Sequence, residues 1–119
     1  MKTKNKIHKV KLFKKSVRHY QKKLSLLNWD MHVFSQKKPG TRASAYWEFS
    51  NKTCSICWSK SWMKENPSKK EIRKVAFHEV CEILLAEVTD KLNIHHSIDT
   101  TEEITHNIIR TLENNFMGV

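Results

Sequence analysis

Residues 75–88 read VAFHEVCEILLAEV, an almost unbroken apolar run that is interrupted by His78, Glu79, Glu82 and Glu87. A helix with apolar residues on nearly every side is expected to be buried, and an ionisable group inside it is costly unless it is paired or binds a metal. His78 and Glu82 are four residues apart, so they project from one helix face with Glu79 beside them. The segment therefore predicts a buried helix that carries candidate metal ligands.

Helices are also predicted on either side of this segment. Apolar residues recur every three or four positions over residues 10–27, which indicates an amphipathic helix that ends near Asn28. The helix that carries the motif is expected to begin after Ser68, where Ser68-x-x-Glu71 has the pattern of a capping box, and to extend to about Leu92. After a loop that contains His95 and His96, a last helix is expected, capped by Asp99 or Thr100. Its apolar positions are Ile104, Ile108, Ile109, Leu112 and Phe116.

Three strands are predicted between the first helix and the motif helix. They are rich in aromatic and β-branched residues, are separated by turn residues, and cover residues 29–35, 42–50 and 53–59. Alternation places Ala43, Ala45 and Trp47 on one face of the second strand, and residues 50–52 are predicted to form a tight hairpin turn. The four tryptophans are interpreted mainly as contacts of the sheet core. The predicted fold class is α+β, with an N-terminal helix, a small three-stranded sheet, the motif helix and a C-terminal helix.

The positive charge of the chain is concentrated at its start. Residues 1–23 contain ten lysines and arginines and no acid, which equals the net charge of +10 for all 119 residues. The chain is therefore divided into a basic N-terminal arm, residues 1–9, and a single domain, residues 10–119. Such an arm can make weak, sequence-independent contact with nucleic acid through phosphates, and the alternative interpretation is a solvated helix face.

The apolar runs and the cysteines indicate in which cellular compartment the protein is expected. No stretch approaches the roughly 20 apolar residues of a membrane span, and the basic N-terminus lacks the apolar part of a signal peptide, so no membrane partner and a cytoplasmic location are expected. Cys54, Cys57 and Cys81 are an odd number, which favours reduced thiols over disulfides. Cys54-x-x-Cys57 is half of a zinc-ribbon pattern, and two strand cysteines on opposite faces are the preferred interpretation.

The motif helix suggests hydrolytic metal chemistry. His78-Glu79-x-x-Glu82 has the spacing of HExxH, in which two ligands come from consecutive turns and the glutamate beside the first is the general base, but its second histidine is a glutamate. A hydrolytic zinc site usually takes three protein ligands. The last helix offers Glu102, Glu103 and His106 as the third. With His106, the donor set is two histidines and one glutamate. The competing interpretation is that Glu79 and Glu82 pair with surface lysines or arginines.

The segment AFHEVCEILLAEV, followed by EEITHNIIRTLEN, resembles small phage and prophage proteins of the metallopeptidase type, with a minimal gluzincin and SprT-like core. The resemblance covers roughly residues 10–116 and implies a Zn²⁺-dependent peptidase in the host cytoplasm that acts on a peptide or protein substrate. Carried over by position, it implies His78, Glu82 and His106 as metal ligands, with Glu103 as the fallback third ligand, and Glu79 as the general base. The carboxylate on the motif helix makes the site richer in oxygen, so manganese or iron are alternative metals.

Two other functions fit the same residues. One is a non-catalytic basic phage protein that binds nucleic acid or a host protein, with a structural or vestigial metal site; a closed set of four ligands, for example His78, Glu82, Glu103 and His106, would favour it. The other follows from Glu103-x-x-His106, which resembles half of a di-iron carboxylate motif. That site normally draws on four bundled helices, whereas this chain is predicted to have about three helices and a sheet.

Overall fold

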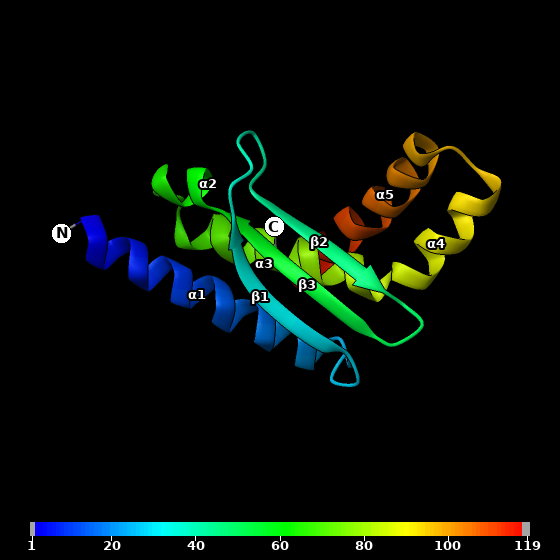
Figure 1. Cartoon of the computed structure of the whole chain (residues 1–119), viewed down its shortest axis with the longest axis horizontal. Coiled ribbons are helices and arrows are strands. Elements are labelled where there is room, and N and C mark those ends of the chain that lie inside the picture. Colours follow the sequence, from blue (N-terminus) through cyan, green and yellow to red (C-terminus); the bar gives the residue numbers. More distant parts are fainter. Residues whose placement is uncertain (1, 118–119) are drawn as a thin grey trace.

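The computed structural model describes residues 2–117, and the side chains of residues 7–117, and it confirms the α+β class (Figure 1). A long helix comes first, three strands follow, and four further helices complete the chain. In chain order the elements are α1 (Lys2–Lys23), β1 (Asp30–Gln36), β2 (Ala43–Glu48), β3 (Thr53–Ser59), α2 (Lys60–Lys64), α3 (Lys69–Leu84), α4 (Ala86–His95) and α5 (Ile98–Phe116). No described helix combines the length and the apolar character that crossing a membrane requires.

The sheet has the strand order β1-β3-β2, in which β3 is central. β1 is parallel to β3, and β2 is antiparallel to it across the predicted turn at residues 50–52. The loop from β1 to β2 therefore passes the end of β3, and it reverses at Pro39 and Gly40. Gly40 has φ +79° and Thr41 N donates to Lys38 O at 3.4 Å, which is the geometry of a type II turn. β2 is left as an edge strand.

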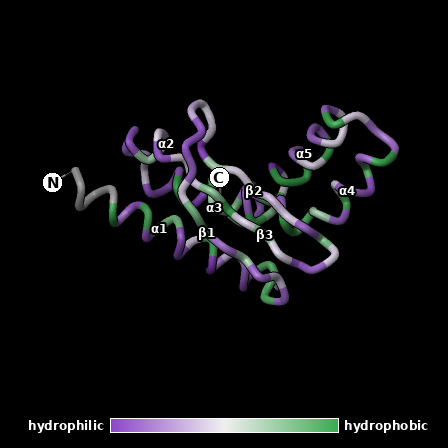
Figure 2. The backbone as a smooth tube through the Cα atoms, viewed as in Figure 1, coloured by the Kyte–Doolittle hydropathy of each residue, from purple (hydrophilic) through white to green (hydrophobic). Residues whose placement is uncertain are grey.

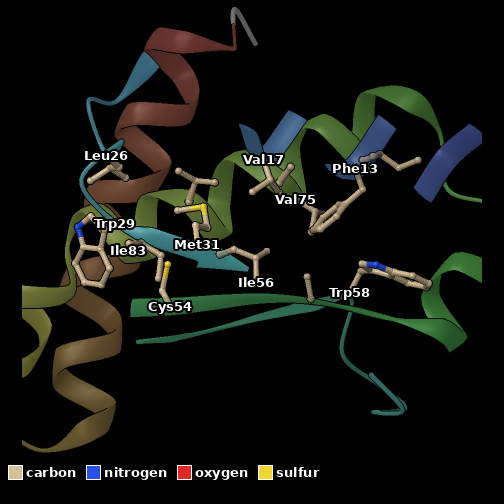
Figure 3. Close-up of a cluster of buried hydrophobic side chains, with 14 of the residues drawn as sticks. Phe13, Val17, Leu26, Trp29, Met31, Cys54, Ile56, Trp58, Val75 and Ile83 are labelled. Carbon is tan, nitrogen blue, oxygen red and sulfur yellow. The ribbon is translucent and has the colours of Figure 1, made fainter. Parts of the chain in front are cut away.

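One face of the sheet is covered by α1 and α3, and this layer contains the main core (Figure 3). Alternation along the strands directs Ala43, Cys54, Ile56, Trp58 and Met31 into it, as predicted for the Ala43 face of β2. Trp29, Trp58 and Trp62 are buried there, and Trp47 packs against them. The opposite face is open, since Phe34 and Tyr46 are about half exposed on it.

Helix α1 is longer at its start than the apolar periodicity suggested. It begins at Lys2 instead of near Val10, so the basic residues predicted to form an arm continue directly into the helix, and it ends at Lys23. Its buried residues include Phe13 and Val17, which pack in the core, and the segment around Leu26 also reaches this core. Figure 2 shows the resulting alternation of hydrophilic and hydrophobic stretches along α1.

Helix α3 is the central helix. It packs against α1, β2 and α5, and it buries residues on two sides. One side joins the sheet core, and the other forms a small second core in which Phe77 and Cys81 meet Ile109 of α5. The side that remains, between β2 and α5, carries His78, Glu79 and Glu82.

The predicted helix from Ser68 to Leu92 is in fact two helices. Ser68 caps α3 by accepting from Glu71 N at 3.1 Å, as the capping pattern predicts. The helix ends at Leu84, and α4 begins at Ala86. No glycine or proline lies at this break. The new direction brings Asp90 of α4 to Trp47 of β2, whose indole donates to it at 3.1 Å.

The last helix also starts earlier than predicted. Its cap is Ser97, whose hydroxyl accepts from Thr100 N at 3.2 Å, and not Asp99 or Thr100. Of its predicted apolar positions, only Ile109 is fully buried. The buried positions of α5 recur every four residues and are mostly polar: Thr101, Thr105, Ile109 and Glu113. Thr101 and Thr105 line the cavity beside His78 and Glu82, and Glu113 contacts His78, whereas Ile109 packs in the second core.

Candidate metal centre

The structure brings together the three residues that were predicted as metal ligands. His78, Glu82 and His106 each offer a ligand atom, and these atoms all lie within 4.8 Å of one another. Glu82 Oε1 is 3.9 Å from His78 Nε2 and 3.5 Å from His106 Nε2. The two imidazole rings lie 5.3 Å apart, centre to centre, at an angle of 51°. Two ligands thus come from one face of α3, and the third comes from α5.

These residues fit a zinc ion in chemistry and in size. Two histidines and one glutamate are a known donor set of catalytic zinc, and a tetrahedral ion with bonds of about 2 Å separates its ligand atoms by roughly 3.3 Å. The observed separations of 3.5 and 3.9 Å are slightly longer than that value, and all the ligand atoms lie within 4.8 Å of one another. Burial, the largest influence, lowers the pKa of His78 and so favours the neutral ring that metal binding requires.

Glu79 lies beside the ligands and is almost fully buried, with 6% of its surface exposed. Its Oε2 has no hydrogen-bond partner among the described residues. Burial, the neighbouring charge of Glu82 and a hydrogen bond to the Glu82 side chain together raise the pKa of Glu79 to about 9. A buried carboxylate without a cationic partner is an arrangement typical of functional sites, since it costs stability wherever it occurs.

Glu113 is a site residue that the sequence analysis missed. It is buried, and its Oε1 lies 3.9 Å from His78 Nδ1, on the side of the ring opposite Glu82. A carboxylate in this position orients a metal-binding histidine and raises its basicity. The signal was present, because Glu113 is seven residues after His106 and so lies on the same face of α5.

The other acids of α5 are not brought into the cluster. Glu103, the predicted fallback ligand, is exposed and does not belong to the group of converging ligand atoms. Glu102 is exposed too, although it lines a neighbouring cavity. The closed four-ligand site with Glu103 is therefore not formed, and the acid nearest to that role is Glu113.

The alternative interpretation, in which the acids pair with surface cations, does not hold in the structure. Within residues 7–117, Glu82 and Glu113 have only histidines within ion-pair distance, and Glu79 has no basic partner. Three acidic side chains therefore gather in one place in a chain with a net charge of +10, and none of them forms an ion pair with a lysine or an arginine whose side chain is described. The raised pKa of Glu79 reflects this crowding of acids, and a divalent cation beside them would favour their charged forms.

The cluster lies where two cavities adjoin. One, of about 410 Å³, is lined by His78, Glu79, His106 and Glu113, and also by Arg42, Lys74 and Arg110. The other, of about 650 Å³, shares the first three of these residues and is lined by residues 43–47 of the edge strand β2, by α4 and by α5. His78, Glu82 and His106 keep between a quarter and two fifths of their side-chain surface exposed, so a ligand can reach the cluster from solvent.

The chain was also compared with known proteins. No family model matches it, and neither does a curated protein or a solved structure. The resemblance to small phage metallopeptidases accordingly stays a prediction.

The burial of Glu79 predicts a pH-dependent gain in stability when its charge is removed. The pKa of Glu79 is about 9 in the folded protein and about 4.5 in the unfolded chain, so its cost to stability is absent below pH 4.5 and grows as the pH rises towards 9. In chelator-treated protein we expect Glu79→Gln to raise Tm by several degrees at pH 8 and by almost nothing at pH 4.5. Glu103→Gln, an exposed control on α5, should leave Tm unchanged at both pH values. A Tm lowered at pH 8 by Glu79→Gln would contradict this account.

Proposed function

We propose that the protein is a metal-dependent hydrolase of the peptidase type, with one divalent cation, zinc in the first place, held by His78, Glu82 and His106. The observation that carries the proposal is the convergence of these three residues beside the buried carboxyl group of Glu79, whose Oε2 has no hydrogen-bond partner among the described residues. When bound, a zinc ion lowers the pKa of water and polarises a carbonyl group.

Glu79 is the proposed general base. It follows His78 directly in α3, and its carboxylate lines both cavities, where an attacking water and a substrate carbonyl would meet. It would accept the proton of the water and later deliver it to the leaving nitrogen of the peptide. His78 is held for its task by Glu113, which lies next to its Nδ1.

The edge strand β2 supports an extended polypeptide as the substrate. Ser59 N donates to Arg42 O at 2.9 Å, and the antiparallel ladder alternates, so the backbone groups of Ser44 and Tyr46 face β3 while those of Ala43, Ala45 and Trp47 face away from it. These free groups lie along the larger cavity beside the cluster. A substrate strand that pairs with them would run past Glu79 and His106.

A cytoplasmic location belongs to the same proposal. It is supported by Cys54, Cys57 and Cys81, which are all free thiols in the structure. Thiols persist in reducing compartments, whereas secreted domains of this size commonly form disulfides.

The metal proposal predicts that each chain binds one ion and that substitution of a ligand removes it. Purified protein should contain about one zinc per chain by elemental analysis, and His78→Ala, Glu82→Ala or His106→Ala should each remove most of it, because three ligands are the usual minimum of a catalytic site. His96→Ala, which changes an exposed histidine outside the cluster, should keep the metal. Folded protein that takes up no zinc, manganese or iron at all would refute the proposal.

The role of Glu113 predicts a smaller effect on affinity. Glu113→Gln keeps the shape of the side chain and removes the charge beside His78, so it should weaken zinc binding about 10–100-fold without abolishing it. Competition with a chromophoric chelator measures this change. Glu103→Gln is the matched control at an exposed position of α5 outside the cluster, and equal affinities for the two variants would argue against an orienting role.

The role of Glu79 as general base predicts that its substitution impairs catalysis and leaves metal binding intact. Glu79→Gln should retain the metal and lower the rate of peptide hydrolysis at least about 100-fold, as expected for the loss of a general base. An unstructured protein such as casein, with cleavage followed by mass spectrometry, provides the assay. Hydrolysis that survives Glu79→Gln unchanged would assign the base elsewhere.

A further inference from the structure

A second pair of cavities lies between α1 and α3, lined by a different part of the molecule from the metal cluster. One cavity measures about 510 Å³ and the other about 300 Å³, and they share Leu12, Lys15 and Arg73, so they form one continuous groove, called the α1–α3 groove below. Its other charged lining residues are Lys9, Lys11 and Lys69. No acid lines it.

The charge of this groove is not compensated by the protein. Among the described side chains, Lys11, Lys15, Lys69 and Arg73 form no ion pair with a carboxylate. Lys9 is held by neutral acceptors, the carbonyl oxygen of Pro67 and the side chain of Asn66. Lysines from one wall thus face a lysine and an arginine from the other, and their mutual repulsion favours an anionic partner between them.

The arrangement fits a linear polyanion better than a small anion. Lys11, Lys15, Arg18 and Lys22 follow one another at intervals of four, three and four residues, so they form one stripe on α1. The groove is lined by the first two residues of this stripe, which at 1.5 Å per residue is about 16 Å long. Arg18 is anchored on it by donating to Met31 O at 2.6 Å. Nucleic acid matches such a row, with one phosphate charge per roughly 3.4 Å of each strand.

A membrane surface is the less suitable partner for the same charges. A helix that lies in a bilayer interface inserts an apolar face beside its cationic one. In α1 that apolar face is already used, since Phe13 and Val17 are fully buried in the core of the domain.

We propose that the α1–α3 groove binds nucleic acid by its phosphodiester backbone, independently of sequence, through Lys11, Lys15, Lys69 and Arg73. This activity does not rest on the metal site: the groove is lined by the first turns of α3, whereas the cluster belongs to its last turns. It also moves the predicted nucleic-acid contact from residues 1–9 to the cleft between two packed helices.

The test uses the full chain and two fluorescein-labelled probes of mixed sequence, a 20-nucleotide single strand and the corresponding duplex. Anisotropy between 50 and 200 mM salt should show binding that weakens steeply with salt. Lys15→Gln with Arg73→Gln should weaken binding about tenfold or more at low salt and reduce the slope of log K against log salt by about 1.4–1.8, as expected for two lost phosphate contacts. Tighter binding of either probe supports the proposal and identifies the preferred form.

The matched control is Lys37→Gln with Lys60→Gln, which makes the same charge change at exposed positions outside the groove. It should alter affinity less than about threefold, and Lys15→Arg with Arg73→Lys should restore binding. All variants should keep the wild-type circular dichroism spectrum and metal content. The proposal is overturned by equal weakening in the groove variant and the control, by the absence of binding to both probes at 50 mM salt, or by binding to phosphatidylserine vesicles with none to either probe.

Discussion

The packing of α3 is the constraint on which the rest of the molecule depends. The helix contacts α1 and the sheet on one side and α5 on another, and each of these contacts includes an apolar core. Its residues His78, Glu79 and Glu82 therefore lie on the remaining side, at the open edge of β2, whereas its basic residues Lys69 and Arg73 line the α1–α3 groove. His78, Glu79 and Glu82 meet there because burying them in either core would leave charges without partners. The position of the site thus follows from hydrophobic packing before any chemistry of the site is considered.

The distribution of charge is the second consequence of this architecture. Lysines and arginines dominate α1 and the start of α3, whereas the buried acids gather around two histidines between α3 and α5. Surface lysines in this chain therefore do not neutralise the carboxylates that most need a counter-charge. A bound cation is the simplest partner for the buried acids, and a polyanion is the simplest partner for the basic groove. The two sites have opposite electrostatic demands and lie at different ends of α3.

The folding of α5 shows how a local pattern and a tertiary environment can disagree. Its isoleucines at 104 and 108 suggest an apolar docking face, yet both remain more than one third exposed. The buried face carries Thr101, Thr105 and Glu113 around Ile109. These polar residues are buried because they pack beside His78 and Glu82 of α3, whose side chains require polar neighbours. Apolar periodicity therefore predicted the helix correctly and its orientation only in part.

The sequence by itself determined the kinds of elements and the key residues of the site. The period of the apolar residues marked the helices, alternation marked the core face of β2, and the four-residue interval placed His78 beside Glu82. These are local properties, set by the geometry of a single helix or strand. Only the tertiary structure decided the strand order β1-β3-β2, the break after Leu84, the distance from Glu82 to His106 and the burial of Glu113. Each of these depends on how elements distant in the chain pack against one another, and no local pattern of residues encodes that packing.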